Sequence, residues 1–368
     1  MVRLLTVLLV LTFVVAAASV SAQSRNPVLA ALPAGQWVQI HVQKPDDAVV
    51  FTRQPHGGGT FDRKRGRLVL FGSDTHGEDW TNSPLFFDLN TLTWSRLYPD
   101  DDPATYQVNA DGIPVAGQNG DHPWAMHTFG AVVYRDAHDD VIVASYPQHL
   151  VPGRFTDAMA HVWPRIQRHP TWRLDLTTGR WQPLAIEAQH FFPYAAAYDR
   201  DRDLVYGYKP EGIFTLGGDP QVWRKALDHG LTGYHNNMVY DARHKVFVVF
   251  GSNGGSSDII VYDGRGRLHR TMATPGMRPS PSEHNPMAFH ERLGKTLVIV
   301  DEGTGADRRA RTWTYDYGRD AWQRVEQAAL PFPVGMNYNM VYDPRDGLLI
   351  LVANPAGAPT AVWALRLP

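Results

Sequence analysis

Short segments of alternating apolar and polar residues run through most of the chain, and polar turns join them in pairs. The clearest pair lies in Gly233–Ser252, where a polar approach leads into a short strand, a five-residue turn and a second strand over Val246–Phe250. Two strands joined by a tight turn make a β-hairpin. The same pattern returns five more times: in His56–Ser73, Gly130–Tyr146, Tyr194–Pro210, His284–Gly303 and Asn337–Asn354. The chain therefore contains six copies of one hairpin.

Each first strand ends in an aromatic residue, which marks the period of the repeat. The markers are Phe61, Tyr134, Tyr198, Tyr240, Phe289 and Tyr342, at intervals of 42 to 73 residues. The shorter intervals match the blade period of a β-propeller, and insertions lengthen the others.

A second repeated piece follows several of the hairpins. In each copy an aspartate stands six positions before a tryptophan: Asp88 and Trp94, Asp175 and Trp181, and Asp316 and Trp322. This piece predicts a third strand, a turn and a fourth strand anchored by an indole ring, and four strands make a propeller blade. We therefore predict an all-β fold, a single β-propeller over residues 23–368. We count six blades, and seven if an insertion hides one.

The two ends of the chain each carry a strand without a neighbour in sequence. Gln36–Val42 alternates like a strand, and Thr360–Leu367 reads as a third strand with no fourth strand after it. We expect Gln36–Val42 to complete the last blade, because closing the ring in this way protects strand edges that would otherwise pair with other chains.

Two long polar insertions flank the hairpin of blade two. Tyr98–Trp124 precedes it and Pro147–Pro170 follows it, and neither shows strand periodicity. Loops of this length in a compact domain usually serve a function. The sequence therefore places the most elaborate surface at blade two.

Composition narrows the class of protein. The chain has 368 residues, a formal net charge of −2 and no cysteine. The charge gives no polycationic surface for nucleic acid, and the absence of cysteine excludes disulfides and thiolate metal sites. Residues 1–22 combine a basic start, an apolar core over Leu4–Ala18 and a small-residue cleavage signal, which predicts a signal peptide. We expect a secreted or periplasmic monomer with no membrane span.

Three histidines stand at the same offset, five positions before the aromatic marker: His56, His235 and His284. In a propeller the first strand of each blade lines the central channel, so these imidazoles should converge near the axis. One interpretation is a divalent metal site, or a ring that binds substrate, in the channel. The other, which the sequence favours, is a polar lining of a water-filled channel.

A second group lies on the hairpins of blades two to four. His127 precedes the first strand of blade two and His149 follows its second strand; Tyr194 and Lys209 take the same places in blade three, and Tyr234 leads into blade four. On adjacent blades these five side chains could surround one groove.

This order of residues resembles the active site of the β-propeller ulvan lyases, exported enzymes with seven blades that cut glucuronate-containing algal polysaccharide by β-elimination. The family has an arginine where this chain has Lys209. The resemblance implies that His127 and Tyr194 transfer protons with help from Tyr234, and that His149 and Lys209 bind the uronate carboxylate. The implied partner is an acidic polysaccharide or oligosaccharide.

Two other readings stay open. One is a kelch-type propeller that binds carbohydrate or protein without catalysis, because a propeller fold does not choose among functions. The other is an enzyme similar to oligogalacturonate lyase, with a metal held by the histidine ring. Copper chemistry of the galactose-oxidase kind lacks its cysteine here, and no repeat-equivalent pair of carboxylates supports glycoside hydrolysis.

Overall fold

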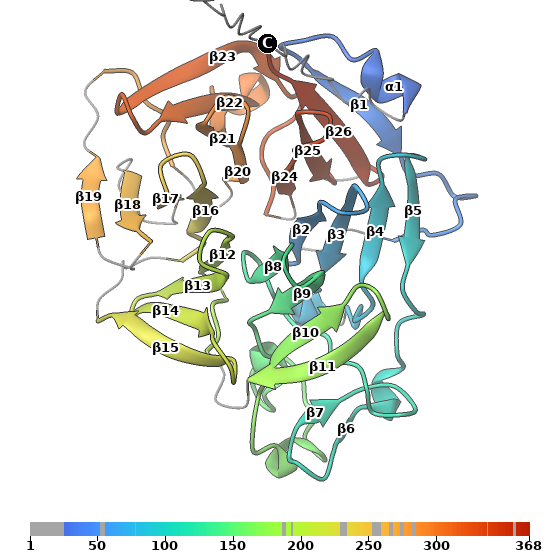
Figure 1. Cartoon of the computed structure of the whole chain (residues 1–368). Helices are drawn as coiled ribbons and strands as arrows, with labels where there is room; N and C mark the ends of the chain where they lie inside the picture. Colours follow the sequence, from blue (N-terminus) through green and yellow to red (C-terminus); the bar gives the residue numbers. More distant parts are fainter. Residues whose placement is uncertain are drawn as a thin grey trace, which may run out of the picture.

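The computed structural model forms six four-stranded antiparallel sheets arranged around a central axis (Figure 1). It describes residues 26–51, 56–77, 79–185, 189–192, 194–228, 234–251, 259–264, 268–272, 276–281, 285–336, 338–355 and 358–368. The predicted signal peptide and His284 lie outside these residues. The six-bladed β-propeller predicted from the repeats is confirmed.

The first three blades follow the chain in order. Blade one holds β2 (Gly58–Asp62), β3 (Arg67–Phe71), β4 (Leu85–Asp88) and β5 (Thr93–Arg96). Blade two holds β8 (Val132–Arg135), β9 (Asp140–Val143), β10 (Thr171–Asp175) and β11 (Arg180–Ala185). Blade three holds β12 (Ala195–Asp199), β13 (Leu204–Lys209), β14 (Gly212–Gly217) and β15 (Val222–Leu227).

The remaining blades complete the ring. Blade four holds β16 (Asn237–Asp241), β17 (Val246–Phe250), β18 (Ile259–Asp263) and β19 (Leu268–Met272). Blade five holds β20 (Met287–His290), β21 (Lys295–Glu302), β22 (Arg309–Asp316) and β23 (Ala321–Ala329). Blade six holds β24 (Asn339–Asp343), β25 (Leu348–Ala353), β26 (Ala361–Arg366) and the N-terminal β1 (Trp37–Val42).

The predicted closure of the ring is confirmed. Strand β1 pairs antiparallel with β26, with Trp37 opposite Leu365 and Val42 opposite Ala361. In Figure 1 the dark blue β1 lies beside the dark red β26. The Trp37 indole also donates a 2.8 Å hydrogen bond to Thr312 Oγ1 of blade five. One N-terminal residue therefore fastens the last two blades together.

A buried aspartate shapes the turn of most of the inner hairpins. Asp62, Asp199, Asp241 and Asp343 each follow the aromatic marker and accept backbone N–H groups of the turn, for example from Arg65 N at 3.0 Å. This is an Asx turn, which the short carboxylate side chain favours. In blade five His290 stands at this place, and its Nδ1 accepts the N–H of Leu293 at 3.3 Å.

Apolar side chains fill the space between neighbouring blades. In blades three and four, for example, Tyr206 and Tyr208 pack with Met238, Tyr240 and Phe247 in one buried cluster. Of the predicted indole anchors on fourth strands, Trp94 and Trp181 are buried and Trp322 is half-buried. The ring thus stands on side-chain packing between sheets.

The two insertions beside blade two pack against each other and form a second, smaller core. Its members include Tyr106, Val108 and Trp124 from the first insertion and Leu150, Met159 and Val162 from the second. The first insertion carries the short strands β6 (Gln107–Val108) and β7 (Pro114–Val115) and the 3₁₀ turn η2 (Pro103–Thr105). The second carries η3 (Gln148–Leu150) and η4 (Trp163–Arg165). Because this core fixes their paths, both segments present ordered surfaces.

The other described helices are short. They are α1 (Pro27–Ala30), η1 (Thr75–Gly77) and η5 (Gly305–Asp307). None of the helices that the structure describes has the length and apolar composition needed to cross a lipid bilayer.

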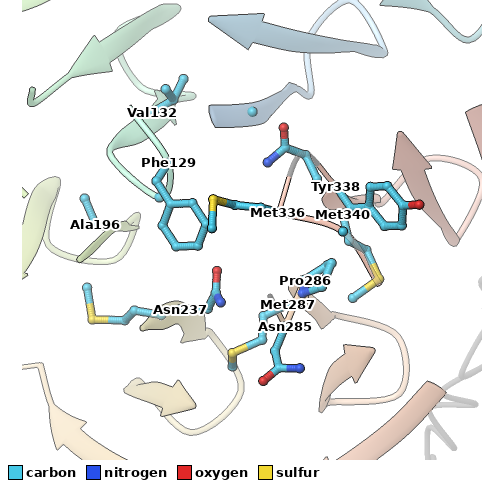
Figure 2. A pocket seen from close by; sticks show the side chains of 15 residues that line it. Phe129, Val132, Ala196, Asn237, Asn285, Pro286, Met287, Met336, Tyr338 and Met340 are labelled. Atoms are coloured by element: carbon cyan, nitrogen blue, oxygen red, sulfur yellow. The ribbon is translucent and has the colours of Figure 1, made fainter. Parts of the chain in front are cut away.

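The central channel narrows to a cavity of about 100 Å³. Figure 2 shows amide groups of Asn237 and Asn285 and the thioethers of Met287, Met336 and Met340 around this space. These side chains give a polar interior with apolar walls. Of the predicted channel histidines, His56 and His235 are described, and they lie at the face of the propeller where the inner strands begin, which we call the front face.

Candidate functional site

Four imidazole rings from blades one and two lie in mutual contact on the front face. We call His56, His76, His127 and His149 the histidine cluster. The ring centroids of His127 and His149 are 3.8 Å apart, those of His56 and His127 4.4 Å, and those of His76 and His149 4.5 Å. Phe192 packs edge-on against three of these rings, with its centroid 5.0 Å from that of His127.

Backbone contacts between blades one and two hold His56 and His127 in place. The carbonyl of His56 accepts the N–H groups of Thr128 and Phe129, at 2.9 and 2.8 Å. The Thr128 hydroxyl donates to the Phe71 carbonyl and accepts the Gly58 N–H, both at 2.7 Å. The two loops that lead into the inner strands are therefore hydrogen-bonded to each other next to the cluster.

The loops that lead into the inner strands share an unusual backbone conformation. His56, Phe129 and His235, which occupy equivalent repeat positions, all have positive φ angles of 66°, 40° and 62°. Residues other than glycine seldom have positive φ angles. Those that do are concentrated at functional sites, where the surrounding structure enforces the conformation. The offset that the sequence singled out therefore marks a real structural position.

His76 and His149 reach the cluster from the loops that leave the second strands. His76 belongs to η1 and His149 to η3, and these two 3₁₀ turns contact each other. Starts of inner strands and ends of second strands meet at the same face because the strands are antiparallel. The insertion of blade two thus delivers His149 to a histidine of blade one.

The rings of the cluster are buried to different degrees. His127 is 1% exposed and His149 is 5% exposed, whereas His76 faces solvent. Burial, followed by the neighbouring imidazoles, holds the pKa of His127 far below its ordinary value, and burial lowers the pKa of His149 to about 3. The charge of Arg154 lowers both pKa values further. The two buried rings are neutral at physiological pH.

One carboxylate stands beside the cluster. Asp74 Oδ1 lies 3.4 Å from His127 Nε2 and 3.6 Å from His76 Nδ1. Ligand atoms of His76, His127 and His149 all lie within 4.8 Å of one another, and so do those of His56, Asp74 and His76. Both groups have the residue types and spacing that can hold a metal ion.

A row of rings continues from the cluster across the front face. The His56 and His235 rings stack at a centroid distance of 5.9 Å, His235 and Tyr234 lie 6.4 Å apart, and Tyr234 and Tyr194 stack at 6.1 Å. At the other end the Phe155 ring lies 4.0 Å from His76. We call this sequence of rings, from Phe155 through the histidine cluster and His235 to Tyr234 and Tyr194, the ring row.

The predicted tyrosines lie side by side in this row. Tyr194 is half-buried, and burial raises its pKa above the ordinary value, with further contributions from Tyr234 and Glu211. A raised pKa keeps the phenol protonated, so Tyr194 is suited to give a proton rather than to take one.

Lys209 has a different environment from the other predicted residues. Its ammonium group lies over the Phe214 ring at 4.9 Å, and Phe214 packs with Phe191 between blades two and three. Burial lowers the pKa of Lys209. The cation whose charge acts on His127 and His149 is instead the exposed Arg154.

The structure therefore regroups the residues that the sequence suggested. It brings His56 together with His127 and His149 in one cluster, and joins His235 to the two tyrosines. Five residues of the site were missed: Asp74, His76, Arg154, Phe155 and Phe192. A signal for His76 existed, because His76 and His149 both follow the second strand of their hairpins by a few residues.

Comparison with known proteins does not identify a family for this chain. No protein-family model and no curated protein matches the chain.

Proposed function

We propose that this protein is an exported polysaccharide lyase that cleaves a uronate-containing polysaccharide by β-elimination. The observation that carries the proposal is the ring row. It spans the front face over blades one to four and has an exposed aromatic side chain at or near each end, Phe155 at 52% and Tyr234 at 53% exposure. These are the two aromatic residues among the exposed large hydrophobic side chains of the described chain.

The shape of the row supports a polymeric ligand. Exposed apolar groups gathered along one surface mark a binding site, and aromatic rings can stack on the apolar faces of sugar rings. Imidazoles and phenols between them offer hydrogen-bond donors and acceptors for hydroxyl groups. A line of rings that crosses several blades suits an extended chain of sugars better than a single small molecule.

Elimination at a uronate requires three tasks. A base removes the proton at C5, the electron pair forms the C4–C5 double bond, and the bond from C4 to the glycosidic oxygen breaks while an acid protonates that oxygen. The negative charge that develops on the carboxylate side must also be stabilised. No oxidant, reductant or added water is needed for this step.

Residues of the ring row can be assigned to these tasks. Tyr194 serves as the acid because its phenol stays protonated. His235 serves as the base, since it lies between His56 and Tyr234 and an imidazole is the commonest general base. We do not assign His127 the proton-transfer role that the resemblance implied, because its ring is enclosed by other rings and 1% exposed. The exposed Arg154 faces the carboxylate, a role that the resemblance implied for His149 and Lys209.

The test is a panel of uronate polysaccharides incubated with purified protein, followed by ultraviolet absorbance of the conjugated double bond and by mass analysis of the products. We expect unsaturated ends on at least one glucuronate-containing polymer. Tyr194→Phe should reduce kcat by about 10²- to 10⁴-fold, the usual contribution of a general acid or base, with little change in binding. His235→Asn should act similarly, and asparagine tolerates the positive φ of this position.

The matched control is His161→Asn, which removes an exposed imidazole from the neighbouring insertion and should leave turnover unchanged. Saturated products, or full activity in both Tyr194→Phe and His235→Asn, would refute the lyase. Binding of a uronate polymer without any unsaturated product would favour a non-catalytic carbohydrate-binding propeller.

A further inference from the structure

The histidine cluster carries a feature that the elimination as assigned above does not use. His127 and His149 are almost completely buried, yet Nδ1 of neither ring has a hydrogen-bond partner within the described residues, and His127 Nε2 has only the Asp74 carboxylate beside it, at 3.4 Å. Buried polar atoms normally have partners, and each exception calls for an explanation. These atoms belong to rings that also face the exposed His76.

The geometry points to a metal ion as the missing partner. We propose that His76, His127 and His149 bind one divalent first-row transition metal ion, Zn²⁺ before others. Their ligand atoms lie within 4.8 Å of one another. Around a zinc ion with bonds of about 2.1 Å, tetrahedral nitrogen ligands are about 3.4 Å apart, so a small inward movement completes the site. His76 can supply that movement because it lies exposed on a three-residue 3₁₀ turn.

The type of ligand selects the type of ion. Neutral imidazole nitrogens suit Zn²⁺, Cu²⁺, Ni²⁺ and Fe²⁺, whereas Ca²⁺ and Mg²⁺ require oxygen ligands. Three histidines with a fourth position left to water or substrate is the arrangement of catalytic zinc sites. This metal site differs from the axial one suggested by His56, His235 and His284, because it lies off the axis, between blade one and the insertion of blade two.

Asp74 supports the site from the side. Its Oδ1 lies 3.4 Å from His127 Nε2 and 3.6 Å from His76 Nδ1, so one carboxylate faces two of the three proposed ligands. Carboxylates next to metal-binding histidines fix the orientation of the rings and raise their basicity as ligands. Asp74 is therefore a positioning residue for the metal site.

The metal site stands without the lyase, but its role in catalysis rests on the proposed function. The open side of the cluster faces solvent at His76, beside the charge of Arg154. A uronate carboxylate in the fourth position would be stabilised by the positive charge of the metal ion, because the neutral imidazoles carry no charge.

The test measures metal binding directly, on full-length protein prepared without a histidine tag. After exhaustive chelation the protein is titrated with Zn²⁺ by calorimetry, and metal content is measured after dialysis. A Co²⁺-loaded sample is examined by visible absorption, which reports the geometry of the ligands. We expect one ion per chain and a tetrahedral or five-coordinate Co²⁺ spectrum. His76→Asn should weaken Zn²⁺ binding by at least about 10- to 100-fold, the range for residues that merely support a ligand.

The control is again His161→Asn, which removes an exposed histidine from the same insertion as His149 and should leave the affinity unchanged. His76 is exposed, so its replacement should not unfold the protein; His149→Asn serves as a second variant, with circular dichroism to check the fold. No retained ion, or equal affinity in wild type, His76→Asn and His149→Asn, would overturn the proposal.

The outcomes separate the two proposals. Zinc binding that depends on His76, with no unsaturated product from any uronate polymer, keeps the metal site and refutes the lyase. A third outcome is that the protein binds zinc as expected in the titration but catalyses elimination equally well after chelation. This outcome supports both the metal site and the lyase and shows that the metal takes no part in the reaction.

Discussion

The rings of His127 and His149 stack with their centroids 3.8 Å apart, although one residue precedes and the other follows the inner hairpin of blade two. The antiparallel pairing of β8 with β9 returns the chain to the front face, and the insertion after β9 turns His149 back over His127. This contact places a pair of neutral, buried imidazoles at the centre of the candidate site.

Removing the exposed cation beside the cluster should weaken substrate binding. We expect Arg154→Gln to raise KM for a uronate polymer by about 10- to 100-fold, because a hydrogen bond to a charged group contributes about 1.5–3 kcal/mol. Steady-state kinetics on the cleaved polymer measures this. Arg168→Gln removes another exposed charge from the same insertion and should leave KM unchanged. Equal effects of the two variants would show that only overall charge matters.

A methyl group at Gly58 should disturb the contact between the first two blades. A Cβ there would lie 2.2 Å from the Phe129 carbonyl oxygen and 2.6 Å from Val132 Cγ2. Because a backbone atom blocks the space, Gly58→Ala should destabilise the fold by about 2 kcal/mol or more and impair activity together with it. Chemical denaturation measures the loss. Gly318→Ala, whose Cβ would meet its nearest neighbour at 3.4 Å, is the matched control; similar stability of the two variants would contradict the clash.

The closure of the ring should depend strongly on Trp37. Its side chain is buried between blades five and six and donates to Thr312 Oγ1. We expect Trp37→Ala to cost about 3–5 kcal/mol of unfolding free energy, the usual range for a buried aromatic residue. Val28→Ala, at an exposed N-terminal position, should cost less than about 0.5 kcal/mol. A denaturation midpoint unchanged in Trp37→Ala would argue that β1 does not hold the ring closed.

His290 should make the fold sensitive to acid. Burial lowers the pKa of His290 from 6.5 to about 4 in the folded protein, where its Nδ1 accepts the Leu293 N–H. As the pH falls below about 6.5, His290 becomes protonated in the unfolded chain. In the folded chain it becomes protonated only at about pH 4. The contribution of neutral His290 to the unfolding free energy is therefore fully present above pH 6.5. It is lost progressively as the pH falls to 4, by up to about 3 kcal/mol.

The matched variant is His290→Asn, because an asparagine side chain can accept the same N–H without titrating. Unfolding free energies at pH 7 and pH 4.5 should differ less in this variant than in the wild type. An identical pH dependence in the two proteins would mean that other buried groups cause the loss.

The sequence by itself determined the repeated unit and its closure. The two strands of a hairpin are separated by only a few turn residues, and Tyr240, for example, pairs with Phe247. The alternation of apolar and polar residues, together with the turn residues, is therefore sufficient to predict each hairpin. The unpartnered strand at each end of the chain then required β1 to pair with β26, because an open edge would be exposed in an otherwise repeating ring. The equal distance of His56 and His235 from the aromatic marker could also be recognised in the sequence. Equivalent positions of a repeat take equivalent backbone conformations, and both residues have a positive φ angle.

Only the tertiary structure decided which chemical groups meet. From the sequence, His56 belonged to the axis and His127 and His149 to a separate groove, while Asp74, His76 and Arg154 carried no repeat signal strong enough to select them. Their meeting depends on how blade one is rotated against blade two and on how the two insertions pack around Trp124 and Leu150. Those arrangements result from many weak contacts between segments far apart in the chain, which have no period, and so no local pattern in the sequence records them.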